Sequence, residues 1–99
     1  MLTINEKFNG KEGTMVLTGK IDMMTAVELD DALRTVLPKV NSLTLDCSRL
    51  AYVSSAGLRV LLSASKNLSE RGGMVLSGLT PPVRQILDVT GMTDLFTIR

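Results

Sequence analysis

The sequence predicts an α/β fold, with a mixed and mostly parallel β-sheet and helices packed against it. Segments that alternate apolar and polar residues, typical of strands, take turns with segments whose apolar residues recur every three or four positions, typical of amphipathic helices. Asn9-Gly10 lies between the first two strand-like segments and indicates a hairpin. Because the later strands alternate with helices, we expect parallel βαβ units. The expected order is β-β-α-β-α-β-α-β.

The two strands of the hairpin are expected at residues 2–8 and 14–20. The first helix follows at Thr25 and Glu28, which match a capping box, a hydroxyl followed three residues later by a carboxylate. Pro38 ends this helix, because the residue before a proline avoids helical geometry. The inward-facing stripe of the helix is expected to consist of Ala26, Leu29, Leu33, Val36 and Leu37.

The middle of the chain contributes a third strand and a second helix. Residues 43–47 alternate and predict the strand. The helix begins near Ser54 and Ser55 and is stopped by Gly72-Gly73. Its inward face is expected to consist of Leu58, Leu61, Leu62, Ser65 and Leu68.

The last third of the chain contributes two strands and one helix. Residues 74–76 are apolar throughout, as in a strand that is buried on both faces. Residues 80–82 (Thr-Pro-Pro) open the third helix, since proline suits a first turn, and Gly91 ends it. Its inward residues are expected to be Val83, Ile86 and Leu87. Residues 95–98 form the last strand, and without a linker or repeat we expect a single domain over residues 1–99.

The composition excludes several classes of function. At 99 residues, 44% hydrophobic and 21% charged, the chain suits one globular domain. A net charge of +1, with one tyrosine, two phenylalanines and no tryptophan, gives no basis for nucleic acid binding. No apolar run approaches the roughly 20 residues of a membrane-spanning helix, and the N-terminus lacks the pattern of a signal peptide. We therefore expect no nucleic acid partner and no direct membrane insertion.

The chain has no histidine and one cysteine, Cys47. This removes the commonest general base and most zinc sites, so we expect no metal, no cofactor and no enzyme activity. A hydrolase with Ser55 as nucleophile would lack a base, and Asp22 and Asp46 are not accompanied by any sign of a substrate pocket. A lone cysteine suits a reducing cytoplasm, and we expect Cys47 to be a small buried hydrophobe.

The most informative stretch is residues 52–59, where an extended segment stops and an amphipathic helix starts at two hydroxyls, Ser54 and Ser55. The start of a helix has unpaired N–H groups and the positive end of the helix dipole, so it favours an anion such as a phosphoryl group. Serine in this place also caps helices. From the loop alone, both roles stay open for both serines.

Four segments, within residues 19–26, 43–48, 53–62 and 83–96, resemble in order those of STAS domains, the bacterial anti-sigma factor antagonists. The likeness spans residues 2–98. It implies a protein of signal transduction and transcription regulation that binds an anti-sigma factor, itself a serine kinase, and so releases a sigma factor. The kinase, which uses ATP and magnesium, phosphorylates a serine at the start of the central helix and blocks binding. A serine phosphatase restores it.

The resemblance also implies which serine accepts the phosphate. In the family pattern Asp-Ser-Ser-Gly the first serine is the acceptor, and alignment on Gly57 puts Ser55 in that place. Ser54 then replaces the aspartate, and Ala56 replaces the second serine. Arg59 lies four residues after Ser55, one helical turn on, within reach of a phosphate there.

The expected partner-binding residues are Asp22, Ser54, Ser55, Ala56, Gly57 and Arg59. By the resemblance, Asp22 is an acidic residue beside the acceptor that engages the kinase; a turn or cap role is the alternative. Asp46 is expected to bind N–H groups of the switch loop, the loop that leads to Ser54 and Ser55, and to hold this loop in place. Met23 and Met24 are expected in the core, with an adaptable exposed interface as the alternative.

A second function stays open. STAS-like domains also occur as subunits of lipid-transport complexes and as tails of anion transporters, so the chain could be a non-phosphorylated binding subunit of such a complex. Gene neighbours separate the two functions. Some STAS domains carry a final helix that is expected to be missing here, because the last strand ends just before Arg99.

Overall fold

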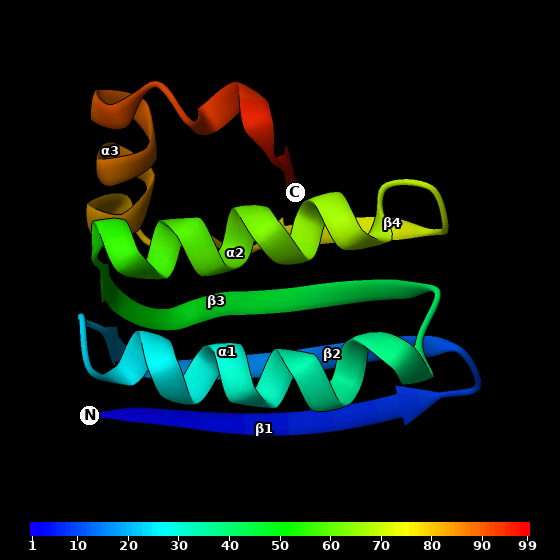
Figure 1. Cartoon of the computed structure of the whole chain (residues 1–99). Coiled ribbons are helices and arrows are strands. Elements are labelled where there is room, and N and C mark those ends of the chain that lie inside the picture. Colours follow the sequence, from blue (N-terminus) through cyan, green and yellow to red (C-terminus); the bar gives the residue numbers. More distant parts are fainter.

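Figure 1 shows the computed structural model, which describes the whole chain, residues 1–99. One sheet holds five strands in the order β1-β2-β3-β4-β5. The strands are β1 (Leu2–Asn9), β2 (Glu12–Ile21), β3 (Ser42–Val53), β4 (Gly73–Ser77) and β5 (Thr97–Ile98). The helices are α1 (Thr25–Val36), α2 (Ser55–Leu68) and α3 (Pro81–Thr90), with short 3-10 helices η1 (Leu37–Lys39) and η2 (Thr93–Leu95). The predicted order of strands and α-helices is confirmed.

The sheet is mixed and mostly parallel, as predicted. β1 and β2 form an antiparallel hairpin, and the pairs β2–β3, β3–β4 and β4–β5 are parallel. The hairpin turn contains Gly10 at φ +61°, a conformation that glycine adopts without steric cost. Each parallel connection passes through a helix, because the chain must return to the other end of the sheet before the next strand can begin.

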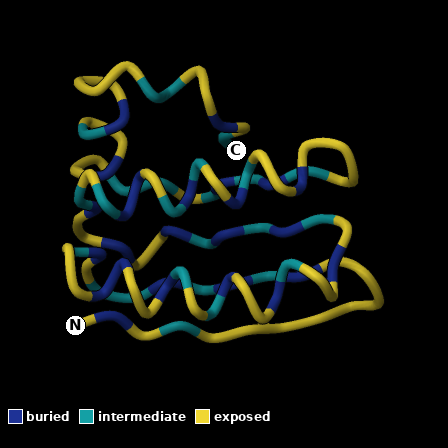
Figure 2. Tube along the Cα trace, viewed as in Figure 1, coloured by how far each residue is buried: buried dark blue, intermediate teal, exposed yellow.

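The helices and the sheet form two layers. α1 and α2 lie side by side over the sheet, and α3 lies across one end, beside the start of α2 (Figure 1). Along β2 and β3, fully buried residues such as Met15 and Leu45 alternate with half-exposed ones, and Figure 2 shows this alternation. One face of the sheet therefore forms the core with the helices. None of the helices is both long and apolar enough to cross a membrane.

The helix faces were predicted well for α1 and less well for α2. In α1 the expected Ala26, Leu29, Leu33 and Val36 are buried, and only Leu37, which lies in η1, is partly exposed. In α2 the buried residues are Gly57, Leu58, Leu61, Ala64 and Leu68. The expected Leu62 and Ser65 are half-exposed, because the face turned to the sheet and to α1 passes through the small Ala64 instead.

β3 is much longer than predicted. The strand was expected at residues 43–47 and runs to Val53, and its pairing with β2 shifts register twice, between Val16 and Thr18 and between Gly19 and Lys20. After Cys47 the buried residues are Leu50 and Val53, three positions apart rather than two. These irregularities break the alternation by which strands are recognised, so the second half of β3 carried no strand signal.

The remaining boundaries differ slightly from those expected. α2 ends at Leu68, before the predicted stop at Gly72-Gly73, and β4 is buried on one face only, since Val75 is half-exposed. The last strand begins at Thr97 rather than at residue 95, because η2 precedes it. Gly91 ends α3 as predicted: its φ is +73°, and the N–H of the next residue donates to the Leu87 carbonyl.

Candidate functional site

The candidate site lies where β2 and β3 end and α1 and α2 begin. Because these strands are parallel and in register at Ile21 and Val53, the loops that follow them leave the same edge of the sheet. The Ser54 N–H donates to the Ile21 carbonyl at 2.7 Å, which ties the two loops together. Asp22 and the serine pair, 32 residues apart in the sequence, are thus brought to one edge. We call this the switch edge (the left-hand side of Figure 1).

Ser54 is the N-cap of α2. Its backbone is extended, with φ −82° and ψ 170°, and its hydroxyl oxygen accepts a hydrogen bond from the Gly57 N–H at 3.1 Å. A serine in this place satisfies one of the N–H groups that have no partner within the helix. The capping role that was open for both serines therefore belongs to Ser54.

Ser55 is the first residue of α2 and is exposed. None of the side-chain hydrogen bonds of the chain involves its hydroxyl. One turn on, Arg59 is also exposed and is not in an ion pair; the ion pair that the chain does form joins Arg34 and Asp30 within α1, at 3.0 Å. The switch edge thus presents a free hydroxyl and a free guanidinium on the first two turns of one helix.

Gly57 is buried beneath this surface rather than part of it. A Cβ added here would lie 2.6 Å from Cγ2 of Ile21 and 2.9 Å from Cγ2 of Val53. Both neighbours are β-branched and buried at the ends of β2 and β3, so they have little freedom to move. Gly57 is expected at the partner surface, but the structure gives it a different role: it lets α2 approach the sheet closely and so positions Ser55.

Asp22 caps α1. Its Oδ1 atom accepts hydrogen bonds from the N–H groups of Met24 and Thr25, at 2.9 and 2.8 Å. These bonds, with the Thr25 backbone bond the largest cause, hold the pKa of Asp22 below its ordinary value. The predicted turn or cap role is confirmed.

The predicted capping box of Thr25 and Glu28 is wrong. Thr25 lies inside the first turn of α1 and is buried; its hydroxyl accepts from the Asp22 N–H at 2.8 Å and lies 2.9 Å from the Lys20 carbonyl, to which it donates. The hydroxyl is therefore engaged with the residues before the helix rather than with the N–H groups of the helix.

Asp46 does not hold the switch loop. It pairs in register with Val16, well back along β3, and its Oδ1 atom accepts from the N–H and the hydroxyl of Ser48 at 3.0 and 2.7 Å. The hydroxyl bond is the largest cause of the lowered pKa of Asp46. Its position was misjudged because β3 was expected to end at Cys47. The carboxylate instead supports the strand where its register with β2 shifts.

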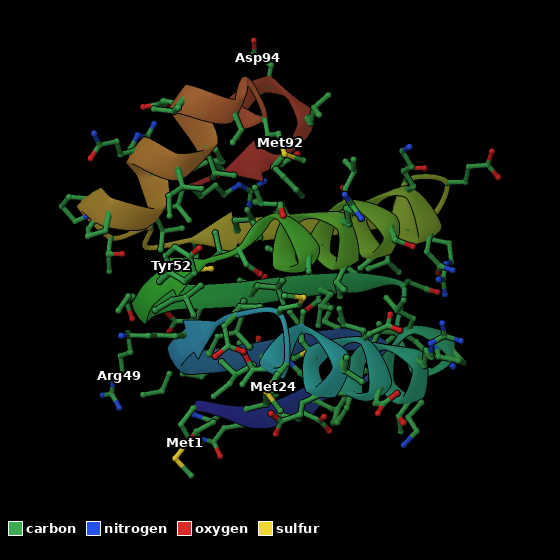
Figure 3. The ribbon with its side chains drawn as sticks, turned by 60° about the vertical axis from the view of Figure 1, so that its left-hand side comes forward. Met1, Met24, Arg49, Tyr52, Met92 and Asp94 are labelled. Carbon is green, nitrogen blue, oxygen red and sulfur yellow. The ribbon has the colours of Figure 1, made fainter.

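Met23 and Met24 are not in the core. They are 75% and 81% exposed and lie in the turn between Asp22 and α1. Figure 3 shows the Met24 side chain at the surface beside the start of α1. The exposed alternative is the correct one, and it places two large apolar side chains next to the capping Asp22.

Sequence reasoning missed a hollow between the first turns of α1 and α2. It has a volume of about 180 Å³ and is lined by Met23, Ala26, Val27, Asp30, Ala56 and Val60. The available signal was the position of Val27, an apolar residue that lies outside the expected inward stripe of its helix.

No group of three or more aspartate, glutamate or cysteine side chains gathers to hold a metal ion. Burial raises the pKa of the Cys47 thiol to about 12, so it stays protonated and unreactive at neutral pH. What the edge does offer is an exposed surface built on two helix starts, which suits binding and modification.

The chain belongs to the STAS domain family: the sequence profile described as "Mlab, STAS domain" matches residues 4–97. It is 36% identical to the putative anti-sigma factor antagonist BtrV of Bordetella bronchiseptica over 84 residues, 83% of this chain and 72% of that protein.

Two solved structures share the fold. An anti-sigma factor antagonist from Mycobacterium paratuberculosis superposes with a TM-score of 0.89 at 24% identity, over 99% of this chain and 85% of the other. The Bacillus cell fate determinant SpoIIAA in its phosphorylated form superposes with a TM-score of 0.74 at 16% identity, over 98% and 91%. Across these differences in sequence the fold is retained.

Proposed function

We propose that this STAS domain is an anti-sigma factor antagonist that binds an anti-sigma factor through the switch edge and is switched off by phosphorylation of Ser55. The observation that carries the proposal is the difference between the two serines. The Ser54 hydroxyl accepts the hydrogen bond that caps α2, whereas the Ser55 hydroxyl is exposed to solvent. The relatives named as antagonists support the binding role, and the phosphorylated SpoIIAA structure supports a fold that tolerates the phosphate.

The domain itself accepts a phosphate at Ser55. The group adds about 1.5 to 2 negative charges at neutral pH. It would stand over the N-terminus of α2, where a negative charge is stabilised by about 0.3–1 kcal/mol. Arg59, exposed and not in an ion pair one turn on, can turn its guanidinium toward the phosphate oxygens. Phosphorylation therefore leaves the fold intact.

A partner packed over Ser55 responds in the opposite way. The phosphate would be buried in the interface without a compensating charge from the partner, which costs several kcal/mol. Since about 1.4 kcal/mol corresponds to a tenfold change in affinity, this cost dissociates the complex. The switch thus acts at the interface and needs no change of conformation.

Asp22 adds a fixed negative charge beside the acceptor. Its Oδ1 atom is engaged by Met24 and Thr25, while Oδ2 takes part in no hydrogen bond within the chain. We assign Oδ2 to the partner: an anti-sigma factor that is also a serine kinase can engage this carboxylate while it delivers phosphate from ATP to Ser55. A serine phosphatase reverses the reaction, and all three proteins act in the cytoplasm.

The test is phosphorylation by the cognate kinase with ATP and magnesium, followed by mass spectrometry of the residues 52–59 segment. Wild type and Ser54→Ala are expected to take one phosphate on Ser55, and Ser55→Ala none. Equal phosphorylation of Ser55→Ala would refute the site. If no variant is phosphorylated while the unmodified protein co-purifies with transport proteins, the chain is the non-phosphorylated binding subunit instead.

A further inference from the structure

The hollow between α1 and α2 lies against the proposed interface. Its wall includes Ala56, which directly follows Ser55 in the first turn of α2, and Val60, which lies one turn further along the same helix. Opposite them, Met23 comes from the turn before α1 and Val27 from its first turn. A partner that covers Ser55 therefore also meets this hollow.

The lining is apolar and its one charge is already used. Five of the six lining residues are hydrophobic, and the sixth, Asp30, is held by Arg34 through the ion pair at 3.0 Å. Asp30 and Val60 also line a second, more polar hollow further along the same two helices. The groove between α1 and α2 is thus apolar beside Ser55 and polar away from it, which places the apolar part where the interface is.

We propose that this hollow is the anchor of the interface: it receives one large apolar side chain of the anti-sigma factor, aromatic or leucine-like. This inference rests on the proposed function and adds to it a contact that does not involve Ser55. The hollow is open to solvent, has a volume of about 180 Å³ and is lined almost entirely by apolar side chains, so such a group can enter it from the surface. Methionine, flexible and polarizable, adapts its shape to an incoming ring, and Met23 lines the hollow.

The hollow and Ser55 have separate roles in binding the anti-sigma factor. A phosphate on Ser55 leaves the lining of the hollow unchanged, so the anchor contributes to affinity in either state, while the phosphate decides whether the complex forms. The anchor also discriminates among anti-sigma factors, because a polar side chain in the corresponding place would lose its water without gaining a hydrogen bond.

The anchor is tested by NMR with the six methionines labelled at their ¹³C-methyl groups and assigned by single Met→Leu substitutions. The purified cognate anti-sigma factor kinase, unlabelled and without ATP, is then added. The methyl signal of Met23, which lines the hollow, is expected to shift, together with the backbone amides of Ser55 and Ala56. Shifts of the amides alone would overturn the anchor and leave the proposed function standing. If nothing shifts and no complex forms, the proposed function itself fails.

A matched pair of valine variants gives the second readout. Val27→Gln changes an exposed valine of the hollow, and Val89→Gln changes an exposed valine of α3 that lies outside it. Val27→Gln is expected to weaken binding of the unmodified protein about tenfold, while Val89→Gln leaves it unchanged. The ratio of affinities between unmodified and Ser55-phosphorylated protein stays the same in Val27→Gln. Equal affinities of the two variants would overturn the anchor.

Discussion

The two ends of the sheet use their polar groups in opposite ways. At the end away from the switch edge, Arg71 donates to the carbonyls of Leu37 and Val40 and to the side chain of Asn67. At the switch edge, Arg59 forms no ion pair and Ser55 is exposed. Arg71 uses its donors to hold loops together, whereas Ser55 and Arg59 at the switch edge leave theirs exposed to solvent.

The largest effect is expected from a substitution that pushes the first turn of α2 away from the sheet. Gly57→Ala is expected to destabilise the fold by about 1–3 kcal/mol, because the new methyl group would overlap Ile21. Helix propensity alone predicts the opposite sign, since alanine is favoured over glycine by about 1 kcal/mol. Urea unfolding measures the change. In an Ile21→Ala background the cost should shrink, and an unchanged cost would show that the close approach is not its cause.

The stability costs of replacing Arg71 and Arg59 compare the two ends of the sheet directly. Arg71→Ala is expected to cost about 1–2 kcal/mol, because it removes three hydrogen bonds from a charged donor at a partly exposed position. Arg59→Ala should change the stability of the unmodified protein by less than about 0.5 kcal/mol. Thermal unfolding of the two variants side by side decides the matter. Equal costs would mean that Arg59 also holds the fold together.

The same contrast exists between neighbouring serines. Ser54→Ala is expected to cost about 1 kcal/mol through loss of the cap to the Gly57 N–H, and Ser55→Ala less than about 0.5 kcal/mol. Chemical denaturation measures both. A larger cost for Ser55→Ala would assign the cap to the wrong serine.

The smallest expected effect is a pH dependence from Asp22. Its folded pKa lies below the unfolded value, which is about 3.9. The stabilisation is therefore present above that unfolded value and is lost as the pH falls through the folded pKa. Because this stabilisation is fully present at pH 7, Asp22→Asn should lower stability at pH 7, by less than Ser54→Ala does, and should flatten the decline of stability as the pH falls below about 3.9. An identical acid profile in both proteins would contradict the cap.

The fold could be predicted from the sequence wherever one periodicity ran undisturbed. The hairpin at Gly10, the stop at Gly91 and four of the five residues expected in the stripe of α1 were correct. The second half of β3 could not be predicted. From Cys47 on, its pairing with β2 shifts register twice, and its buried residues lie three positions apart instead of two. A bulge depends on the pairing of two strands and is not written in either of them alone.

The candidate site was predicted in its members but not in their roles. Asp22 and Ser54 both turned out to be caps, which depends on where each helix begins to within one residue. Gly57 was assigned to the surface because a glycine in a motif does not reveal which neighbours press on it. The hollow lined by Met23 and Val27 was missed, because it depends on how α1 and α2 pack against each other and not on either segment alone.

Ser55 is the proposed switch, and Ser54 is its structural support. The decisive measurement is the affinity of the cognate anti-sigma factor for unmodified protein and for protein phosphorylated on Ser55, with unfolding temperatures measured on the same samples. We expect phosphorylation of Ser55 to lower the affinity for the anti-sigma factor at least about 100-fold, with little change in the unfolding temperature. Equal affinities, or a loss that appears only because the phosphorylated protein unfolds, would contradict it.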